Sequence, residues 1–187
     1  MSCGWQGRKV RLVPLDKGKH FDNALQWLGD PEVTQWTLIG DFPISHLAEE
    51  EFFDRMMRGD PNDVVFAVET LDGEHVGMTG IHRIDWRQQV GNTGTLIGRK
   101  DLWGRGYGSD AIQVRTRYAF DVLGLRMLLS EALADNVASQ KALWKAGYRE
   151  VGRIPNRYWK RGAYRDVVLL MVDSDSWKGS GQSDKRA

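Results

Sequence analysis

The chain has almost no cysteine and no long apolar run. Cys3 is the single cysteine among 187 residues, so the chain forms no internal disulfide and no cysteine-based metal site. No apolar stretch reaches the roughly 20 residues that span a bilayer, and residues 1–11 lack the apolar core of a secretory signal peptide. We therefore expect a protein of the cytoplasm, with no membrane partner and no metal.

An excess of charge of one sign is also missing. Lys and Arg number 26, Asp and Glu number 25, and the formal net charge is +1. Proteins that bind mainly to nucleic-acid phosphates carry a basic excess, so we expect no nucleic-acid partner. What the chain does contain is 41% hydrophobic and 27% charged residues, a balance typical of one folded domain with a core.

The first half of the chain begins with helical periodicity. A short apolar strand is predicted over 10–13, followed by helices over 20–28 and 45–57, the latter with Ser45 as its N-cap. The segment 30–43 between the helices is rich in Trp, Thr, Gly and Pro and is expected to be partly irregular. The side chains of the second helix that should face the core are Leu47, Phe52, Phe53 and Met56.

Strand patterns follow these helices. The segments 64–69 and 75–84 flank Asp72-Gly73, a dipeptide that indicates a tight turn between antiparallel strands. Together with a shorter strand over 93–97, they predict an antiparallel meander.

The second half of the chain alternates between helix and strand. Its elements are expected as a helix over 109–123, a strand over 127–133, a helix over 136–146 and strands over 148–154 and 164–172. This order predicts an α/β (α+β) fold in which one mixed sheet carries helices on both faces. Residues 1–172 form the expected domain. Residues 173–187 contain no aliphatic side chain larger than alanine, and we expect them to be a disordered tail.

Three alternating glycines, Gly104, Gly106 and Gly108, precede the helix over 109–123. Glycines let successive backbone N–H groups point into one hollow, and the start of a helix adds unpaired N–H groups and the positive end of its dipole. The turn therefore predicts a site for a phosphate or pyrophosphate, to which Arg105 adds charge. The alternative is a tight turn that binds no ligand.

The same turn matches a dinucleotide-binding fingerprint, Gly106-x-Gly108-x-x-Ala111, with Glu131 as the acid that would bind a ribose. In that fold the first glycine directly follows a strand, whereas residues 99–103 intervene here. Too little chain follows for the further βα units that the fold requires. A nicotinamide-dependent oxidoreductase is therefore the weaker interpretation.

Three stretches of the chain, taken with their order and spacing, form one sequence pattern. They are Ile97-Gly-Arg-Lys-Asp-Leu-Trp-Gly-Arg-Gly-Tyr-Gly-Ser-Asp-Ala111, Ala134-Asp-Asn-Val-Ala-Ser139 and Lys145-Ala-Gly-Tyr148. In this arrangement they resemble the GNAT superfamily of acyl-CoA N-acyltransferases, and the element order fits from about Val10 to Val172. The branch that the chain most resembles is the RimJ/RimL-like one, named for enzymes that acetylate ribosomal-protein N-termini.

This resemblance implies an N-acetyltransferase that moves the acetyl group of acetyl-CoA directly to a primary amine of a protein N-terminus or a small molecule. It implies a sheet splayed between its fourth and fifth strands, with pantetheine along the fourth strand and the pyrophosphate in the glycine turn. The implied cofactor-binding residues are Ile97, Gly98, Arg99, Arg105, Gly106, Tyr107, Gly108, Ser109 and Asn136. For Asn136, a role as helix N-cap is the alternative, and both roles are compatible.

The implied reaction needs a group that takes a proton from the amine and a group that protonates the departing thiolate. Many relatives place a tyrosine acid on the last helix, where this chain has Leu143. Ser139 is therefore our candidate acid, and a hydroxyl that merely caps the helix is the alternative. Glu131 and His82 are the candidate bases, although either can equally be structural. The branch often carries an acidic residue on its fourth strand, where this chain has Asn92.

Other possibilities stay open at this point. An acyl-CoA-binding module without catalysis would keep the fold and explain the missing tyrosine. Homodimers are common in the resembled family, so a homodimer is a further expectation. The basic stretch 153–165 around Tyr158 is either a solvated hairpin or a guide for an acidic substrate or a cofactor phosphate.

Overall fold

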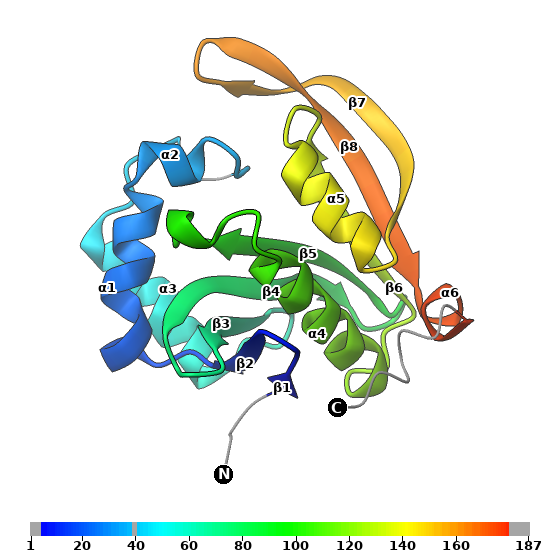
Figure 1. Cartoon of the computed structure of the whole chain (residues 1–187), viewed down its shortest axis with the longest axis horizontal. Coiled ribbons are helices and arrows are strands. Elements are labelled where there is room, and N and C mark those ends of the chain that lie inside the picture. The colour runs from blue at the N-terminus through cyan, green and yellow to red at the C-terminus, as the bar shows by residue number, and fades with distance from the viewer. Residues whose placement is uncertain (1–4, 39–40, 180–187) are drawn as a thin grey trace.

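The computed structural model describes residues 5–38 and 41–179. In this part of the chain, eight strands form one sheet (Figure 1) in the order β1-β2-β3-β4-β5-β6-β8-β7. The strands are β1 (Trp5–Gln6), β2 (Val10–Pro14), β3 (Val64–Thr70), β4 (His75–Asp85), β5 (Val90–Ile97), β6 (Met127–Leu133), β7 (Arg149–Lys160) and β8 (Ala163–Asp173). The helices are α1 (Lys17–Leu28), α2 (Pro31–Thr34), α3 (His46–Arg58), α4 (Tyr107–Asp121), α5 (Val137–Lys145), α6 (Ser174–Gly179) and the 3-10 turn η1 (Lys100–Leu102). The predicted order of elements is confirmed, with β1, α2, η1 and α6 as additions.

Neighbouring strands run antiparallel except β5 and β6, which are parallel. This pair keeps its register only from Val90 opposite Met127 to Thr93 opposite Ser130, and beyond these residues the two strands diverge. Although β5 lies in the middle of the sheet, Gly94 is exposed and residues 95–97 are half-buried. The predicted splay is confirmed, with β5 and β6 in the places of the fourth and fifth strands.

Helices cover both faces of the sheet. On one face, Phe21 of α1 and Phe53 of α3 pack against Ala67 of β3. On the other face, Val114 of α4 packs with Val68 of β3, and α4 joins α5 in a further cluster over β6 and β8. Figure 1 looks onto this second face, where α4 and α5 lie in front of the strands. One helix, α4, therefore contacts both halves of the splayed sheet.

One prediction about the buried face of α3 is wrong. Phe53 is fully buried, and Phe52 and Met56 pack partly against the same cluster, as predicted. Leu47 is instead 63% exposed. The buried face of the helix carries Glu49 as well as Phe53, and Leu47 lies about 200° around the helix axis from Glu49.

The expected disordered tail from residue 173 is wrong over its first part. Asp173 ends β8 and the next six residues form α6. Trp177 is 2% exposed and packs edge-on against Phe120 of α4, with ring centroids 6.1 Å apart. The segment lacks large aliphatic side chains, but a single tryptophan such as Trp177 buries enough surface to hold a short helix on the core. Residues 180–187 lie outside the described residues.

None of the helices in the described ranges combines the length and the apolar composition that a membrane span requires.

Candidate active site

The diverging part of β5 presents an open backbone edge. The N–H of Gly98 donates to the carbonyl of Val76 at 3.0 Å, so Gly98 faces β4. Because successive residues of a strand point their backbone groups to opposite edges, Thr95 and Ile97 face β6. The last pair between these strands is at Thr93, so the N–H groups of Thr95 and Ile97 have no strand partner in the described part of the chain. Such an edge can pair with an extended ligand.

The predicted pantetheine-binding residues differ in what they offer. The N–H groups of Gly98 and Arg99 both point to the Val76 carbonyl, at 3.0 and 3.4 Å. The carbonyl of Ile97 accepts the indole N–H of Trp103 at 2.7 Å. Of the three predicted residues, Ile97 therefore offers an N–H to the opening, and Thr95, which the sequence analysis did not select, offers another.

A buried layer supports this edge from behind. A Cβ atom on Gly98 would lie 1.8 Å from the ring of Trp27, so the indole packs directly on the glycine backbone. Trp27 also contacts His75, with ring centroids 4.6 Å apart, and His75 Nε2 lies 3.0 Å from the carbonyl oxygen of Gly77. Burial, followed by the charge of the neighbouring His20, lowers the pKa of His75 to about 4. The neutral ring is therefore part of a packed support.

The glycine turn forms the N-terminus of α4. Gly104 and Gly106 have φ angles of 74° and 89°, in the left-handed region that favours glycine. Gly106 is the N-cap of the 15-residue helix α4, and no side chain caps it. The N–H groups of the first turn, from Tyr107 to Ser109, have no partner inside a helix by geometry. The turn therefore has the form of the predicted anion site, although α4 begins two residues earlier than predicted.

A residue that the sequence analysis missed lies beside this turn. A Cβ atom on Gly106 would lie 3.6 Å from Cε of Lys9, and Lys9 Nζ is 5.5 Å from the centroid of the Tyr107 ring. The carboxylate of Asp110 holds this segment by accepting the N–H groups of Lys9 and Val10 at 2.8 and 3.0 Å. An ammonium group therefore stands next to the uncapped helix N-terminus. No local pattern signals it, because Lys9 and Gly106 are far apart in the sequence.

The first turn of α5 borders the opening from the β6 side. Asn136 Oδ1 accepts the N–H of Ser139 at 3.0 Å, and its Nδ2 donates to the carbonyl of Trp36 at 3.1 Å. The proposed N-cap is therefore present. The half-buried hydroxyl of Ser139 forms no hydrogen bond with the rest of the described chain, which leaves it free to donate. Leu143, where relatives have the tyrosine, is buried in the core.

Glu131 lies on the sheet face opposite α5. Its neighbours Leu128 and Ala132 pack toward α4 and α5, so alternation places Glu131 on the other face. The hydroxyl of Tyr158, on β7, donates to Glu131 Oε2 at 3.1 Å. Burial, followed by the charge of Glu131, raises the pKa of Tyr158. The phenol therefore stays protonated and orients the half-buried carboxylate of Glu131 through this hydrogen bond.

His82 shares this face with Glu131 but does not contact it. The ladder pairs His82 with Asn92, and Asn92 with Leu129, and paired residues lie on one face. Burial lowers the pKa of His82, while the charge of Asp63, whose Oδ1 lies 3.7 Å from Nδ1, opposes this. Strand β5 separates His82 from β6, and no hydrogen bond or ion pair between described residues joins the two candidate bases.

The β7–β8 hairpin reaches back across the splay. Lys160, whose side chain is 3% exposed, forms an ion pair with Asp41 at 2.9 Å, and Arg161 donates to Thr34 of α2 at 3.2 Å. In Figure 1 the hairpin arches above α5 toward α2. The basic stretch is therefore a hairpin whose side chains largely contact other parts of the chain. It borders the sheet face on which Tyr158 contacts Glu131.

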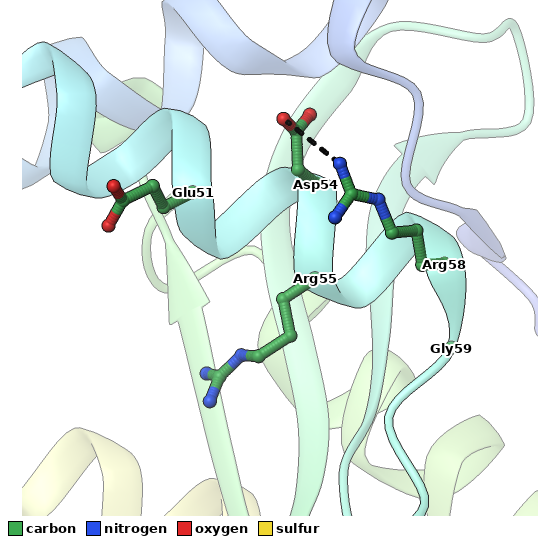
Figure 2. A pocket seen from close by; sticks show the side chains of 5 residues that line it. All are labelled: Glu51, Asp54, Arg55, Arg58 and Gly59. Carbon is green, nitrogen blue, oxygen red and sulfur yellow. Dashed lines mark ion pairs between the residues drawn. The ribbon is translucent and has the colours of Figure 1, made fainter.

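Two surface hollows lie away from the glycine turn. One of about 400 Å³, shown in Figure 2, is lined by Glu51, Asp54, Arg55, Arg58 and Gly59 at the end of α3. Since α3 and α4 cover opposite faces of the sheet, this hollow cannot include the turn. The other, of about 610 Å³, is lined by Asp60, Asn62, Asp63, Arg83, Ile84, Asp85 and Trp86, and it adjoins His82 through Asp63.

Comparison with known proteins gives one consistent family. The model of an acetyltransferase (GNAT) domain matches residues 9–149. The uncharacterized N-acetyltransferase p20 of Bacillus licheniformis is 26% identical over 161 residues, which are 84% of this chain and 89% of p20. A candidate ribosomal N-acetyltransferase, YdaF of Bacillus subtilis, is 26% identical over 108 residues, which are 58% of each protein.

Solved structures share the fold. The spermidine N-acetyltransferase of Vibrio cholerae, in complex with CoA and spermine, superposes with a TM-score of 0.83 over 90% of this chain and 98% of that one, at 16% identity. The dinucleotide interpretation of the glycine turn is wrong, because the sheet is mostly antiparallel and α4 leads to a strand that diverges from β5. Since the matched region runs from β2 to the start of β7, sequence and fold agree that this chain belongs to the GNAT family of acetyl-CoA-dependent N-acetyltransferases.

Proposed function

We propose that this protein acetylates a primary amine, either the N-terminus of a protein or a small molecule, by direct attack on acetyl-CoA. The observation that carries this proposal is the open edge of β5, which is followed, after the short connection that contains η1, by the uncapped N-terminus of α4. An extended amide chain ending in a pyrophosphate matches both features at once. The same residues would bind CoA in a protein without catalysis, so turnover is the deciding measurement.

The donor side uses backbone groups. The N–H groups from Gly106 to Ser109 would hold the pyrophosphate with help from Lys9. The N–H of Arg105 already donates to the carbonyl of Leu102 at 3.3 Å, so Arg105 would contribute through its guanidinium. The N–H of Ile97 would bind the pantetheine arm. Two residues earlier, the N–H of Thr95 would point at the thioester carbonyl and stabilise its oxygen in the transition state.

The reaction needs two proton transfers. The amine nitrogen forms a bond to the carbonyl carbon, the carbon–sulfur bond breaks, and CoA leaves as a thiolate. We propose that Glu131, coupled to Tyr158, takes the proton that nitrogen loses. Ser139, whose hydroxyl is uncommitted, donates a proton to the thiolate, directly or through water, and regains one from solvent. Since a thiol has a pKa of about 8.5, this acid contributes modestly.

The acceptor class follows from how easily the amine becomes neutral. An α-amino group with a pKa near 8 is about one-tenth neutral at pH 7, whereas an alkyl amine near 10.4 is neutral in only about 0.04% of molecules. A half-buried carboxylate is a weak base, which favours an α-amine. This argument, together with the similarity to YdaF, supports a RimJ/RimL-like acceptor, a protein N-terminus, inside the cytoplasm.

The test is release of CoA thiol from acetyl-CoA over a panel of amines. The panel contains short peptides with free N-termini, the same peptides with blocked N-termini, and spermidine. Turnover with the free peptides supports the proposal in full, and turnover with spermidine alone replaces the acceptor class. A thermal shift with acetyl-CoA but no turnover across the panel would identify a silent CoA-binding module.

A further inference from the structure

A buried cation without a charged partner lies at the point where the sheet splays. Arg115 of α4 is 1% exposed. Its guanidinium donates to uncharged groups: to Thr79 Oγ1 at 3.0 Å, to Thr95 Oγ1 at 2.7 Å, to the Gly94 carbonyl at 3.0 Å and to Tyr148 Oη at 3.1 Å. No carboxylate among the described residues forms an ion pair with it, and its Nε is buried without a hydrogen-bond partner.

Such a group is costly for folding. A buried charge loses its hydration, and hydrogen bonds to neutral groups compensate for that loss only in part. Replacement of buried ion pairs by apolar side chains of similar size is often neutral or stabilising, because the cost arises when one charge is left behind without its partner. Removal of Arg115 leaves no such partner charge among the described residues. The position of Arg115 therefore calls for a role other than stability.

The contact with Gly94 connects Arg115 to the open edge. Gly94 pairs with Gly80, and its carbonyl points toward β4. The N–H of Gly98, four residues further along the chain, points the same way. The other end of the same peptide group is the N–H of Thr95, which points into the splay. A charge-assisted hydrogen bond to the oxygen of a peptide polarises it and makes its N–H a stronger donor.

We propose that Arg115 is a positioning residue that acts through the Gly94–Thr95 peptide to strengthen the N–H facing the thioester. This inference rests on the proposed function. When the amine adds to the carbonyl carbon, an electron pair moves onto the carbonyl oxygen, and when the carbon–sulfur bond breaks, the charge passes to sulfur. Both charges develop beside a peptide that a buried cation polarises. Arg115 itself touches neither substrate.

A purely structural role predicts a different behaviour. If Arg115 served only to tie α4 to β4 and β5, its removal would lower the melting temperature and weaken acetyl-CoA binding together. If it serves catalysis, its removal leaves the melting temperature unchanged or raises it, while the rate falls. The two roles therefore separate by stability and rate measured on the same variant.

The experiment compares Arg115→Met, Arg115→Lys and the double variant Arg115→Met/Tyr148→Phe, which also removes the phenol hydroxyl that loses its charged donor. Arg117→Met is the matched control, because Arg117 lies on the same helix and donates outward to the carbonyl of Gln6. The measurements are kcat, KM for acetyl-CoA, the melting temperature, and the infrared carbonyl band of bound acetyl-CoA labelled with ¹³C at the carbonyl.

We expect Arg115→Met to lower kcat roughly 10-fold, less than the loss of a direct oxyanion donor, with KM within about twofold. The carbonyl band should lie closer to that of free acetyl-CoA than in the wild type, Arg115→Lys should recover part of both effects, and Arg117→Met should change neither. An unmoved band overturns the inference, whether or not the rate falls. If the wild type binds acetyl-CoA without turnover, the band alone decides. A wild type that does not bind acetyl-CoA overturns the proposed function first.

Discussion

The two sides of the splay are built differently. On the donor side, the open edge of β5 is supported by buried groups: Trp27 packs on Gly98, and Arg115 binds the peptide before Thr95. On the acceptor side, the candidate groups Glu131 and His82 are half-buried side chains. The difference teaches that the site for the acyl donor depends mainly on backbone and packing, whereas the site for the amine depends on a few replaceable side chains. The four predictions below test this contrast, beginning with the largest expected effect.

Removing the base on the acceptor side should have the largest effect. Glu131→Gln should lower kcat about 100-fold, because general base catalysis typically contributes 10²–10⁴-fold. The affinity for acetyl-CoA, measured by calorimetry, should stay unchanged. Tyr158→Phe should show a smaller loss in the same assay.

His82→Gln is the matched control, since His82 lies on the same face across β5. Its kcat should stay within about threefold of the wild type. The opposite pattern, with a large loss in His82→Gln and none in Glu131→Gln, would transfer the role of base to His82.

A change in the backbone of the donor side should affect binding instead of the chemical step. Gly106→Val forces a β-branched residue into a φ of 89°, which costs roughly 1–3 kcal/mol where the left-handed conformation is kept. We expect the Kd for acetyl-CoA to rise at least 10-fold as the turn distorts. Gly162→Val, at a φ of 82° in the hairpin turn, is the control for backbone strain, and equal loss of affinity in both would contradict the assignment.

The buried support of the donor edge should make stability depend on acid. The pKa of His75 is about 4 in the folded chain against about 6.5 when unfolded, so the unfolded state binds the proton more readily. The contribution of neutral His75 to the free energy of unfolding is fully present above pH 6.5. It is lost as pH falls toward 4, and the loss reaches up to roughly 3 kcal/mol.

Unfolding by urea between pH 7 and pH 4 measures this loss. His75→Gln should flatten the dependence on pH, although its stability at pH 7 should be lower. His46 is exposed, and His46→Gln, as the control, should leave the pH profile as in the wild type. A profile for His75→Gln that parallels the wild type would show that another group, such as Glu69, carries the effect.

The smallest effect is expected at Lys9. Lys9→Met should raise the Kd for acetyl-CoA only about 2- to 5-fold, because one exposed ammonium adds a screened attraction to a phosphate. The difference between variant and wild type should shrink between 50 and 500 mM salt. Lys19→Met, on the outer side of α1, serves as the control, and a difference for Lys9→Met that is independent of salt would argue against a phosphate contact.

Much of the fold could be predicted because its signals are local. Ser45 and Asn136 cap their helices through hydrogen bonds to residues three positions later, and Asp72-Gly73 makes its turn with Gly73 at a positive φ. The meander follows from alternating side chains and this turn. The errors at Leu47 and in the tail concern which apolar surface finds a partner, and that depends on distant elements.

The candidate site divides in the same way. The glycine turn was recognisable because an anion site at a helix N-terminus needs only consecutive residues. By contrast, Lys9, Tyr158 and Arg115 acquire their roles from partners on other elements. The basic residues around Tyr158 were recognisable in the sequence, but nothing there indicated its contact with Glu131, and nothing in the segments of Lys9 and Arg115 distinguishes them from ordinary surface or core residues.

By itself, the sequence determined the succession of helices and strands, the left-handed turn before α4 and the family, because each rests on residues close together along the chain. The family resemblance already implied where the sheet opens, but only the tertiary structure decided at which residue pairing ends, which N–H groups face the opening, and that a buried guanidinium lies behind them. These properties depend on register and packing between segments that are distant in the sequence, and side-chain type alone does not specify such contacts.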